Sequence, residues 1–249
     1  MGSCPESDTA FSKPLMRPSV LRTHVRALTE SRHATTRNRE TVVCLVSGGI
    51  DSPVAVWLTA KKGLMPVCVY FDNSPYADET TRQRALETMK RLKQHIAEDI
   101  KFYIVSHGAN LTEILEKCPR NLTCVLCKRM MYRVAEKIAL KENAEAIVTG
   151  EIIGEHASQT LRNLHIETEA LSKVTILRPL AGLNKTEVEQ LARKIGTFEA
   201  SAQPASCCKA PPAQPRTRAR PEEVAFAEKK LDINAMVRCS LENMSFLTV

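Results

Sequence analysis

From position 41 onward, short apolar runs alternate with longer segments in which apolar residues recur every three or four positions. In the segment 127–142, Met131, Val134 and Ile138 fall on one face of a helix, and the segment 77–97 has the same spacing. Short apolar runs between such segments are typical of buried strands. The predicted strands are 41–46, 66–71, 101–105, 145–149 and 174–177.

This alternation predicts an α/β fold built from βαβ crossovers. We expect an open, mostly parallel five-stranded sheet with helices on both faces, a Rossmann-like arrangement that binds ligands at the carboxyl ends of its strands. The pattern divides the chain into a basic N-terminal arm over 1–39, a main domain over 40–201, and a final region over 202–249. That final region begins as a basic, proline-rich loop with cysteines and continues as a helical segment, 222–244, which we expect to pack on the main domain.

Composition adds information about partners and compartment. Apolar residues make up 43% and charged residues 25% of the 249 positions, as in ordinary globular proteins. No apolar run is long enough for a membrane helix, and the first residues lack the layout of a signal peptide, so we expect a cytoplasmic protein without membrane partners. The net charge of +7 suits a polyanionic partner, because Lys and Arg that neutralise phosphates release counterions.

The first predicted strand runs into a glycine-rich turn with the features of a phosphate cradle. Two glycines allow close backbone approach to an anion, and the N-terminus of the following helix adds partial positive charge. The turn has neither the lysine of a Walker A loop nor the spacing of a GxGxxG loop; SGGIDS resembles instead the SGGxDS signature of the PP-loop ATP pyrophosphatases. That resemblance implies that the turn holds the pyrophosphate of ATP and that its aspartate supports Mg²⁺. The residues of the turn are Ser47, Gly48, Gly49, Ile50, Asp51 and Ser52.

Nine cysteines in a chain without a secretion signal point to metal or sulfur chemistry rather than to disulfides. Cys124 and Cys127 form a CxxC at the start of a predicted helix, where the helix dipole is expected to lower thiol pKa values. With Cys207 or Cys208 as the third ligand, they can hold an iron-sulfur cluster of the 4Fe-4S type that leaves one iron open for sulfide. A zinc site and a metal-free disulfide or persulfide relay are the alternatives.

Longer blocks extend the resemblance to most of the chain. TGE at 149–151, ASQTLRNL at 157–164, LRPL at 177–180 and PASCC at 204–208 resemble the catalytic domain of the tRNA 4-thiouridine synthetase (ThiI) family, and the similarity runs over 41–245. The resemblance implies an adenine nucleotide alpha hydrolase-like fold and ATP-dependent thiolation of a tRNA uridine, in which the C4 carbonyl oxygen is adenylated and sulfur displaces AMP. It implies tRNA and a sulfur donor, either sulfide or a persulfide carrier, as partners. The alternative is a PP-loop sulfurtransferase that acts on a small molecule in thiamine-type cofactor biosynthesis.

The same resemblance implies roles for residues at matching positions. Asp51, Lys185 and Cys207 match catalytic positions, with Lys185 neutralising charge on the phosphates. Gly150 is expected to shape the ATP pocket, and Asp72, directly after the second strand, is interpreted as a nucleotide contact or as a turn residue. Family members with a CxxC imply that this motif supplies two iron-sulfur ligands.

Four other side chains have two interpretations each. Lys128 and Arg129, after the CxxC, either guide tRNA phosphate or belong to a solvated helix face. Arg178 either contacts phosphate or pairs with an acid, and Thr160 either caps a helix or touches substrate.

The sequence departs from the family pattern in three respects. The arm of about 40 residues is too short for the family's RNA-binding THUMP region, no rhodanese domain is present, and Asn184 stands where the family has Asp. We therefore expect intact ATP chemistry together with a separate RNA-binding partner. A homodimer, in which one subunit's arm holds tRNA over the other's active site, is the second hypothesis for tRNA capture.

Overall fold

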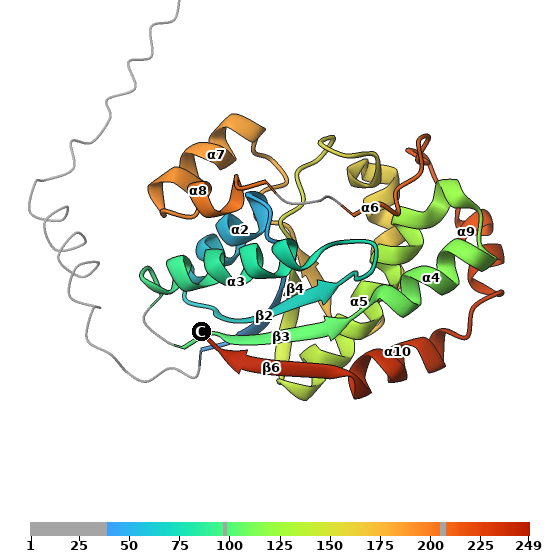
Figure 1. The fold of residues 1–249 in the computed structure, drawn as a ribbon, viewed down its shortest axis with the longest axis horizontal. Coiled ribbons are helices and arrows are strands. Elements are labelled where there is room, and N and C mark those ends of the chain that lie inside the picture. Colours follow the sequence, from blue (N-terminus) through green and yellow to red (C-terminus); the bar gives the residue numbers. More distant parts are fainter. Residues whose placement is uncertain (1–38, 97–98, 205–207) are drawn as a thin grey trace, which may run out of the picture. The chain divides into compact units, whose positions relative to one another are not determined.

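A six-stranded sheet organises the part of the chain that the structure, a computed structural model, describes: residues 39–96, 99–204 and 208–249. The strand order is β5-β4-β1-β2-β3-β6 (Figure 1), with β6 antiparallel to β3 and the other pairs parallel. The strands are β1 (Thr41–Val46), β2 (Met65–Asp72), β3 (Lys101–Ser106), β4 (Ala144–Val148), β5 (Thr175–Leu177) and β6 (Met244–Thr248). The helices are α2 (Asp51–Lys61), α3 (Glu79–Lys93), α4 (Gly108–Lys117), α5 (Thr123–Lys141), α6 (Leu161–Thr168), α7 (Lys185–Lys194), α8 (Phe198–Ser201), α9 (Pro221–Glu228) and α10 (Ile233–Glu242), with short 3-10 turns at Arg120–Leu122 and Ala157–Gln159.

Some of the sequence predictions fall outside the described residues. The basic arm over 1–39 does so except for Arg39, and Cys207 does so as part of 205–207. Within the described ranges, no helix is both long and apolar enough to cross a bilayer.

The mostly parallel sheet predicted from the sequence is confirmed, but it has a sixth strand that was not predicted. The segment expected to be helical over 222–244 forms α9 and α10, and the chain then returns along the sheet edge as β6. Phe246 of β6 is 61% exposed, and the strand is paired on one side only. A short edge strand with exposed side chains has a weak sequence pattern, so pairing with β3 decides its conformation.

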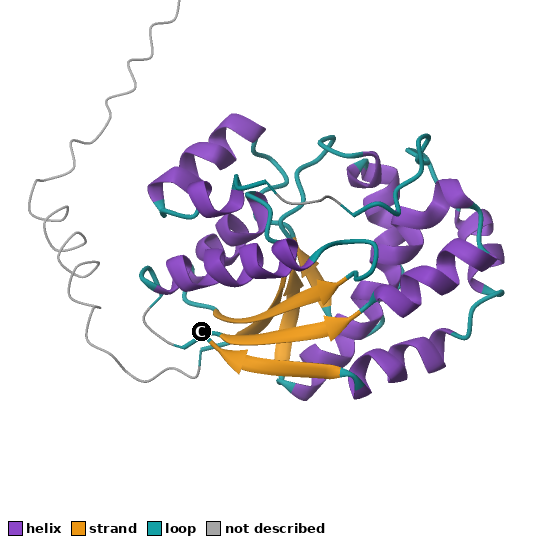
Figure 2. Ribbon diagram, viewed as in Figure 1, coloured by secondary structure: helices purple, strands orange, loops and turns teal. Residues whose placement is uncertain are grey.

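Helices cover both faces of the sheet and enclose two clusters of buried apolar side chains (Figure 2). Successive residues of β1 alternate between the clusters, as the pleat of a strand requires. Val43 belongs to the cluster with α4, α5, α9 and α10, whereas Val42 lies in the cluster with α2, α3 and α7. Val224 of α9 and Val237 of α10 pack in the same cluster as α5, so the C-terminal helices share the core of the sheet.

The strand order reverses at β1, which pairs in parallel with β2 on one side and with β4 on the other. The crossovers that leave β1 and β4 therefore run in opposite directions along the sheet. A reversal of this kind opens a crevice at the carboxyl ends of the two strands, where α/β proteins bind their ligands. The predicted phosphate turn follows β1, and Gly150 follows β4.

Candidate active site

The turn between β1 and α2 is closed by its own serines. The backbone N–H of Ser47 donates to Oγ of Ser52 at 3.1 Å, and the N–H of Gly49 donates to Oγ of Ser47 at 3.3 Å. Gly48 has a φ of 71°, and a Cβ there would lie 2.8 Å from the carbonyl oxygen of Thr81 in α3. Backbone conformation and close packing both require glycine at this position. The turn leads into the N-terminus of α2, where the helix dipole favours an anion.

Gly150 brings the loop after β4 against the same turn. A Cβ on Gly150 would lie 2.9 Å from both the backbone N and the Cα of Ser52. Only a residue without a side chain allows this approach, because real Cβ contacts are longer. Gly150 therefore shapes the phosphate turn through its backbone.

Asp51, the first residue of α2, forms an ion pair with Lys185, the first residue of α7. The Nζ of Lys185 lies 2.8 Å and 3.1 Å from the two carboxylate oxygens of Asp51. A capping box fixes the start of α7: Oδ1 of Asn184 accepts from the N–H of Glu187 at 3.0 Å, and the Glu187 carboxylate accepts from the N–H of Asn184 at 2.7 Å. Asn184, which departs from the family pattern, therefore acts as an N-cap, a role that Asn fills as well as Asp.

A cavity of about 420 Å³ lies at the carboxyl ends of β1 and β4, a volume typical of small-ligand sites. The predicted cofactor-binding residues that line it are Ser47, Gly49, Asp51, Ser52 and Gly150. The predicted residues outside its lining are Gly48, Ile50, Asp72 and Lys185. Asp72 accepts a hydrogen bond from the N–H of Ser74 at 3.0 Å, as a turn residue does.

A larger cavity, of about 720 Å³, lies between α5 and α10. Its walls include Arg133, Ile233 and Val237, and it shares no lining residue with the smaller cavity. We place the candidate active site at the smaller cavity, because the strand-order reversal, the phosphate turn and the Asp51–Lys185 pair all meet there.

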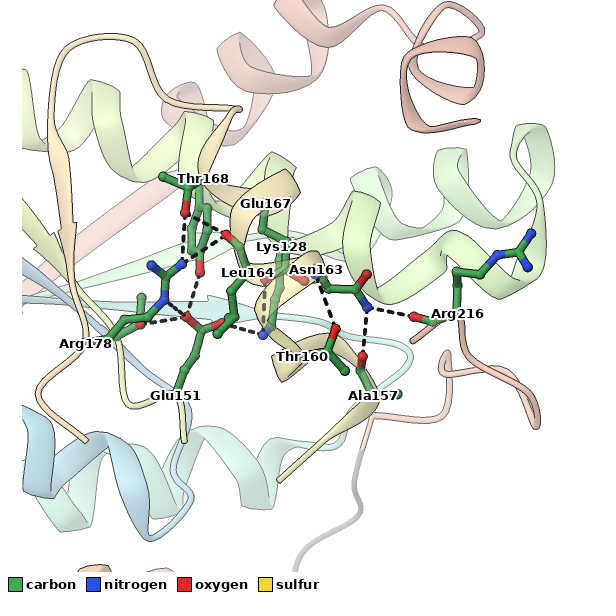
Figure 3. A network of polar contacts seen from close by, with 12 residues as sticks. Lys128, Glu151, Ala157, Thr160, Asn163, Leu164, Glu167, Thr168, Arg178 and Arg216 are labelled. Atoms are coloured by element: carbon green, nitrogen blue, oxygen red, sulfur yellow. Dashed lines mark hydrogen bonds and ion pairs between the residues drawn. The ribbon is translucent and has the colours of Figure 1, made fainter. Parts of the chain in front are cut away.

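Glu151, in the wall of the smaller cavity, is the centre of a buried polar network (Figure 3). Its carboxylate accepts from Nζ of Lys128 at 2.5 Å and from Nε of Arg178 at 2.7 Å. The hydroxyls of Thr149 and Tyr132 also donate to it, at 2.9 Å and 3.1 Å. Burial alone would raise the pKa of Glu151, but the charges and hydrogen bonds of Lys128 and Arg178 outweigh it and lower the pKa below its ordinary value.

A second carboxyl group in the network, that of Glu167, is fully buried and has no hydrogen-bond partner among the described residues. Its nearest cation is Lys128, with Nζ 3.6 Å from the carboxylate. Burial raises the pKa of Glu167 to about 8, against the charge of Lys128, and the charge of Glu151 adds to the rise. Sequence reasoning missed Glu167, because a glutamate on an amphipathic helix is usually exposed.

These contacts correct the interpretation of Lys128 and Arg129 as a solvated helix face. Lys128 is paired with Glu151 and lines the smaller cavity, and Arg129 is buried in an ion pair with Glu228, with Nε 2.8 Å from the carboxylate. The interpretation of both residues as guides for tRNA phosphate stays a prediction. Arg178 pairs with an acid, as one of its two interpretations stated.

The structure also decides between the two interpretations of Thr160, because this residue caps α6. Its Oγ1 accepts from the N–H of Asn163 at 3.3 Å. Asn163, fully buried, then ties the basic loop to α6: its Nδ2 donates to the carbonyl oxygens of Ala157 at 2.8 Å and Arg216 at 2.7 Å (Figure 3), and its Oδ1 accepts from the N–H of Ala219 at 3.0 Å.

Three thiols meet near the cavity. Cys124 and Cys127 lie in the first turns of α5, and Cys208 lines the cavity. Burial, followed by the neighbouring Cys208 thiol, raises the pKa of both Cys124 and Cys127 above the ordinary value. The expectation that the helix dipole would lower these pKa values is therefore wrong for the metal-free protein, because loss of solvation outweighs the dipole.

The donor chemistry of this group suits an iron-sulfur cluster, since soft thiolates are the ligands that iron and sulfide clusters take. Among the residues that the structure describes, no three His, Cys, Asp or Glu side chains are grouped closely enough to hold a metal ion. Cys208 raises the pKa of both Cys124 and Cys127, so its thiol lies near the CxxC motif.

The chain is similar to known proteins over most of its length. The sequence model of the thiamine biosynthesis protein (ThiI) family matches residues 37–233. The probable tRNA sulfurtransferase of Methanosarcina mazei is 42% identical over 202 residues, which cover 81% of this chain and 50% of that protein. The probable tRNA sulfurtransferase of Thermoanaerobacter sp. is 42% identical over 190 residues, which cover 76% of this chain and 50% of that protein.

The solved structures include a similar chain in the crystal structure of a 4-thiouridine synthetase–RNA complex with bound ATP. Its TM-score is 0.78 at 32% sequence identity, and the match covers 84% of this chain and 55% of that chain. The present chain spans about half the length of the curated relatives it matches.

Proposed function

The chain belongs to the thiamine biosynthesis protein (ThiI) family, and we propose that it catalyses the ATP-dependent conversion of a tRNA uridine to 4-thiouridine. The observation that carries this proposal is that the PP-loop turn and the thiol of Cys208 line the same cavity, so adenylation and sulfur delivery can act on one carbonyl group. The relatives named tRNA sulfurtransferases, and the 4-thiouridine synthetase with RNA and ATP, support tRNA as the substrate.

In the proposed reaction, the C4 carbonyl oxygen of the uracil attacks the α-phosphorus of ATP. The bond from this phosphorus to the oxygen bridging the β-phosphate breaks, and pyrophosphate leaves. A sulfur nucleophile then attacks C4, and AMP leaves with the original carbonyl oxygen. Splitting the substitution into two steps is favourable because the adenylated oxygen is a good leaving group, whereas an amide-like carbonyl oxygen is not.

On the ATP side, residues 47–52 hold the pyrophosphate portion in this proposal, with the turn amides and the α2 N-terminus as donors. The Asp51 carboxylate supplies the oxygen ligands that Mg²⁺ prefers, and Lys185 beside it neutralises charge that develops on the phosphates. Gly150 forms part of the nucleotide pocket, and Asp72, at the carboxyl end of β2, is the proposed contact to the adenosine portion.

On the sulfur side, Cys124 and Cys127 are the proposed ligands of a 4Fe-4S cluster. The candidates for the third ligand are Cys207, which matches the family's catalytic cysteine, and Cys208, whose thiol lines the cavity and raises the pKa of both motif thiols. When bound, such a cluster would supply an open iron position for sulfide. The protein's own part is to hold Cys124 and Cys127 in the first turns of α5 and Cys208 in the wall of the cavity where the adenylated uridine would lie.

The first test is an anaerobic assay of reconstituted protein with unmodified tRNA, Mg-ATP and sulfide, followed by mass spectrometry of the digested nucleosides. We expect 4-thiouridine to form, and we expect Asp51→Asn to lower both its formation and pyrophosphate release by about 100-fold, as loss of a charge that stabilises a transition state does. Asp99→Asn is the control, because Asp99 is an exposed aspartate on the same chain, with 77% of its side chain accessible.

The other outcomes of this assay separate the alternatives. Thiolation without iron would show that sulfide attacks the adenylated carbonyl directly, without a cluster. Full thiolation by the Asp51→Asn protein would exclude the proposed ATP site. If no thiolated nucleoside forms, we would add a separate RNA-binding protein, and then screen small carbonyl compounds for stimulation of pyrophosphate release, as expected of a cofactor-biosynthesis enzyme.

A further inference from the structure

His107 lies directly after β3, at the carboxyl edge of the sheet and at the N-cap of α4. Its side chain is fully buried. The edge of the ring packs against Phe71, with ring centroids 5.4 Å apart and an interplanar angle of 76°, and the backbone N–H donates to the carbonyl oxygen of Asp72 at 2.8 Å. Backbone and ring are therefore both fixed in orientation, although no step described so far uses this residue.

The two ring nitrogens of His107 have different partners. Nε2 lies 3.3 Å from Sγ of Cys127, and Nδ1 lies 3.3 Å from Nδ2 of Asn110. The same Nδ2 donates to Oγ of Ser240 in α10 at 2.7 Å. These contacts form a buried chain from α10, through α4, to a sulfur of the CxxC motif.

This chain of contacts assigns the tautomer of the ring. An amide nitrogen only donates hydrogen bonds, so Nδ1 must accept from Asn110. An imidazole whose Nδ1 accepts a hydrogen bond in this way is neutral and carries one proton. That proton is then on Nε2, the nitrogen that faces the sulfur of Cys127.

We propose that His107 is a positioning residue that donates a hydrogen bond from Nε2 to the sulfur of Cys127, and that Asn110 sets the tautomer needed for it. The role in cluster binding rests on the proposed function, whereas the hydrogen bond itself does not. A neutral donor aimed at a buried sulfur stabilises the thiolate form, which burial otherwise disfavours. Outer partners of this kind orient metal ligands and tune the metal centre.

Three variants separate this role from packing. His107→Phe keeps a ring of similar volume and removes the donor. His107→Gln keeps an N–H donor at the distance of Nε2 from the backbone. Asn110→Asp leaves His107 in place but offers a carboxylate that accepts from Nδ1–H, which moves the proton away from Nε2. His95→Phe, at an exposed histidine, is the control for loss of a histidine.

The hydrogen bond is tested in metal-free protein by ¹⁵N NMR of histidine-labelled samples. The signals of His107 are identified as those that are missing from the His107→Phe protein. We expect a protonated Nε2 and an unprotonated Nδ1 in the wild type, and the reverse in Asn110→Asp. A wild-type ring protonated on Nδ1 would overturn the inference. The thermal midpoint of each variant is measured alongside, so that a misfolded protein is recognised.

The role toward the cluster is tested in reconstituted protein by the rate of iron loss to a chelator and by the reduction midpoint followed by electron paramagnetic resonance. We expect His107→Phe and Asn110→Asp to lose iron about 10-fold faster, as losses of outer hydrogen bonds do, and to have lower midpoints, because hydrogen bonds to sulfur favour the reduced cluster. His107→Gln should retain most of both properties. Equal behaviour of His107→Phe and wild type would refute the role.

Failure of the proposed function gives a different result from failure of this inference. If wild-type protein takes up no iron under any reconstitution condition, the cluster is excluded. The NMR tautomer then still decides whether His107 donates to Cys127, because that measurement uses no metal.

Discussion

Individual residues shape the candidate active site mainly through contacts with the backbone and with residues that are distant in the sequence. Gly150 has its effect because it has no side chain, and Lys185 reaches the site through the carboxylate of Asp51. Glu151 holds two cations at once and remains ionised in a buried position. Glu167, with only Lys128 as a cation at 3.6 Å and no hydrogen bond among the described residues, is kept protonated near neutral pH by burial.

At the residue scale, Gly150→Ala tests the contact between the β4 loop and the phosphate turn. The added Cβ would lie 2.9 Å from the backbone of Ser52, so the turn must shift or the variant must lose stability. We expect a loss of about 1–3 kcal/mol in the free energy of unfolding, typical of overpacking, and slower pyrophosphate release. Gly182→Ala is the matched control, because a Cβ there meets no atom within 4 Å. Equal effects of the two substitutions would argue against the contact.

At the scale of secondary structure, long-range ion pairs fix helices around the site. Glu228 of α9 binds two arginines of α5, with Arg129 Nε at 2.8 Å and Arg133 Nη1 at 2.7 Å. Burial works to raise the pKa of Glu228, but the hydrogen bonds and charges of these arginines lower it to about 2. The pair therefore joins α9, which follows the basic loop, to the helix that carries the CxxC motif.

The sign of the pH dependence follows from this lowered pKa. The carboxyl of Glu228 titrates near 4.5 in the unfolded chain and near 2 in the folded protein, so its contribution is complete above pH 4.5 and is lost as pH falls to 2. We expect Glu228→Gln to lower the unfolding free energy at pH 7 by about 3 kcal/mol, and the difference from wild type to shrink towards pH 2. Urea denaturation across this pH range measures both. Glu222→Gln, at an exposed position of α9, should show neither effect.

At the scale of the whole molecule, as far as the structure describes it, the basic loop lies near the carboxyl edge of the sheet, where the smaller cavity is. Lys209, Arg216, Arg218 and Arg220 occur in a segment, 208–220, without an acidic residue. Asn163 ties this segment to α6 beside the cavity. The net charge of +7 thus includes a local concentration of cations near the site where a tRNA uridine would enter.

Arg218, an exposed residue of this loop, is the test position for tRNA binding. If its guanidinium contacts a phosphate, Arg218→Ala should weaken binding of all tRNAs alike and reduce the slope of log affinity against log salt by about 1. Filter binding at several salt concentrations gives both quantities. Lys62→Ala is the control, because Lys62 ends α2 at the opposite edge of the sheet. A salt slope unchanged by Arg218→Ala would show that tRNA does not contact this arginine.

The phosphate turn and the five parallel strands were predictable because their causes are local. SGGIDS specifies a turn and a helix start within six residues, and the strands stand out as short apolar runs between helical segments. The cap formed by Thr160 also has a local cause, because the accepting hydroxyl of Thr160 and the donating N–H of Asn163 are three residues apart.

Tertiary structure decided what depends on neighbours far away in the sequence. Lys128 and Arg129 have the composition of a charged helix face, yet Glu151 and Glu228 hold them inside the molecule. The sixth strand exists because β3 offers it an edge, and the thiol pKa values rise because burial outweighs the helix dipole. By itself, the sequence determined the local backbone conformation of the phosphate turn. The charge state of the groups around that turn was decided by burial and by ion pairs between distant residues, which exist only once the chain has folded.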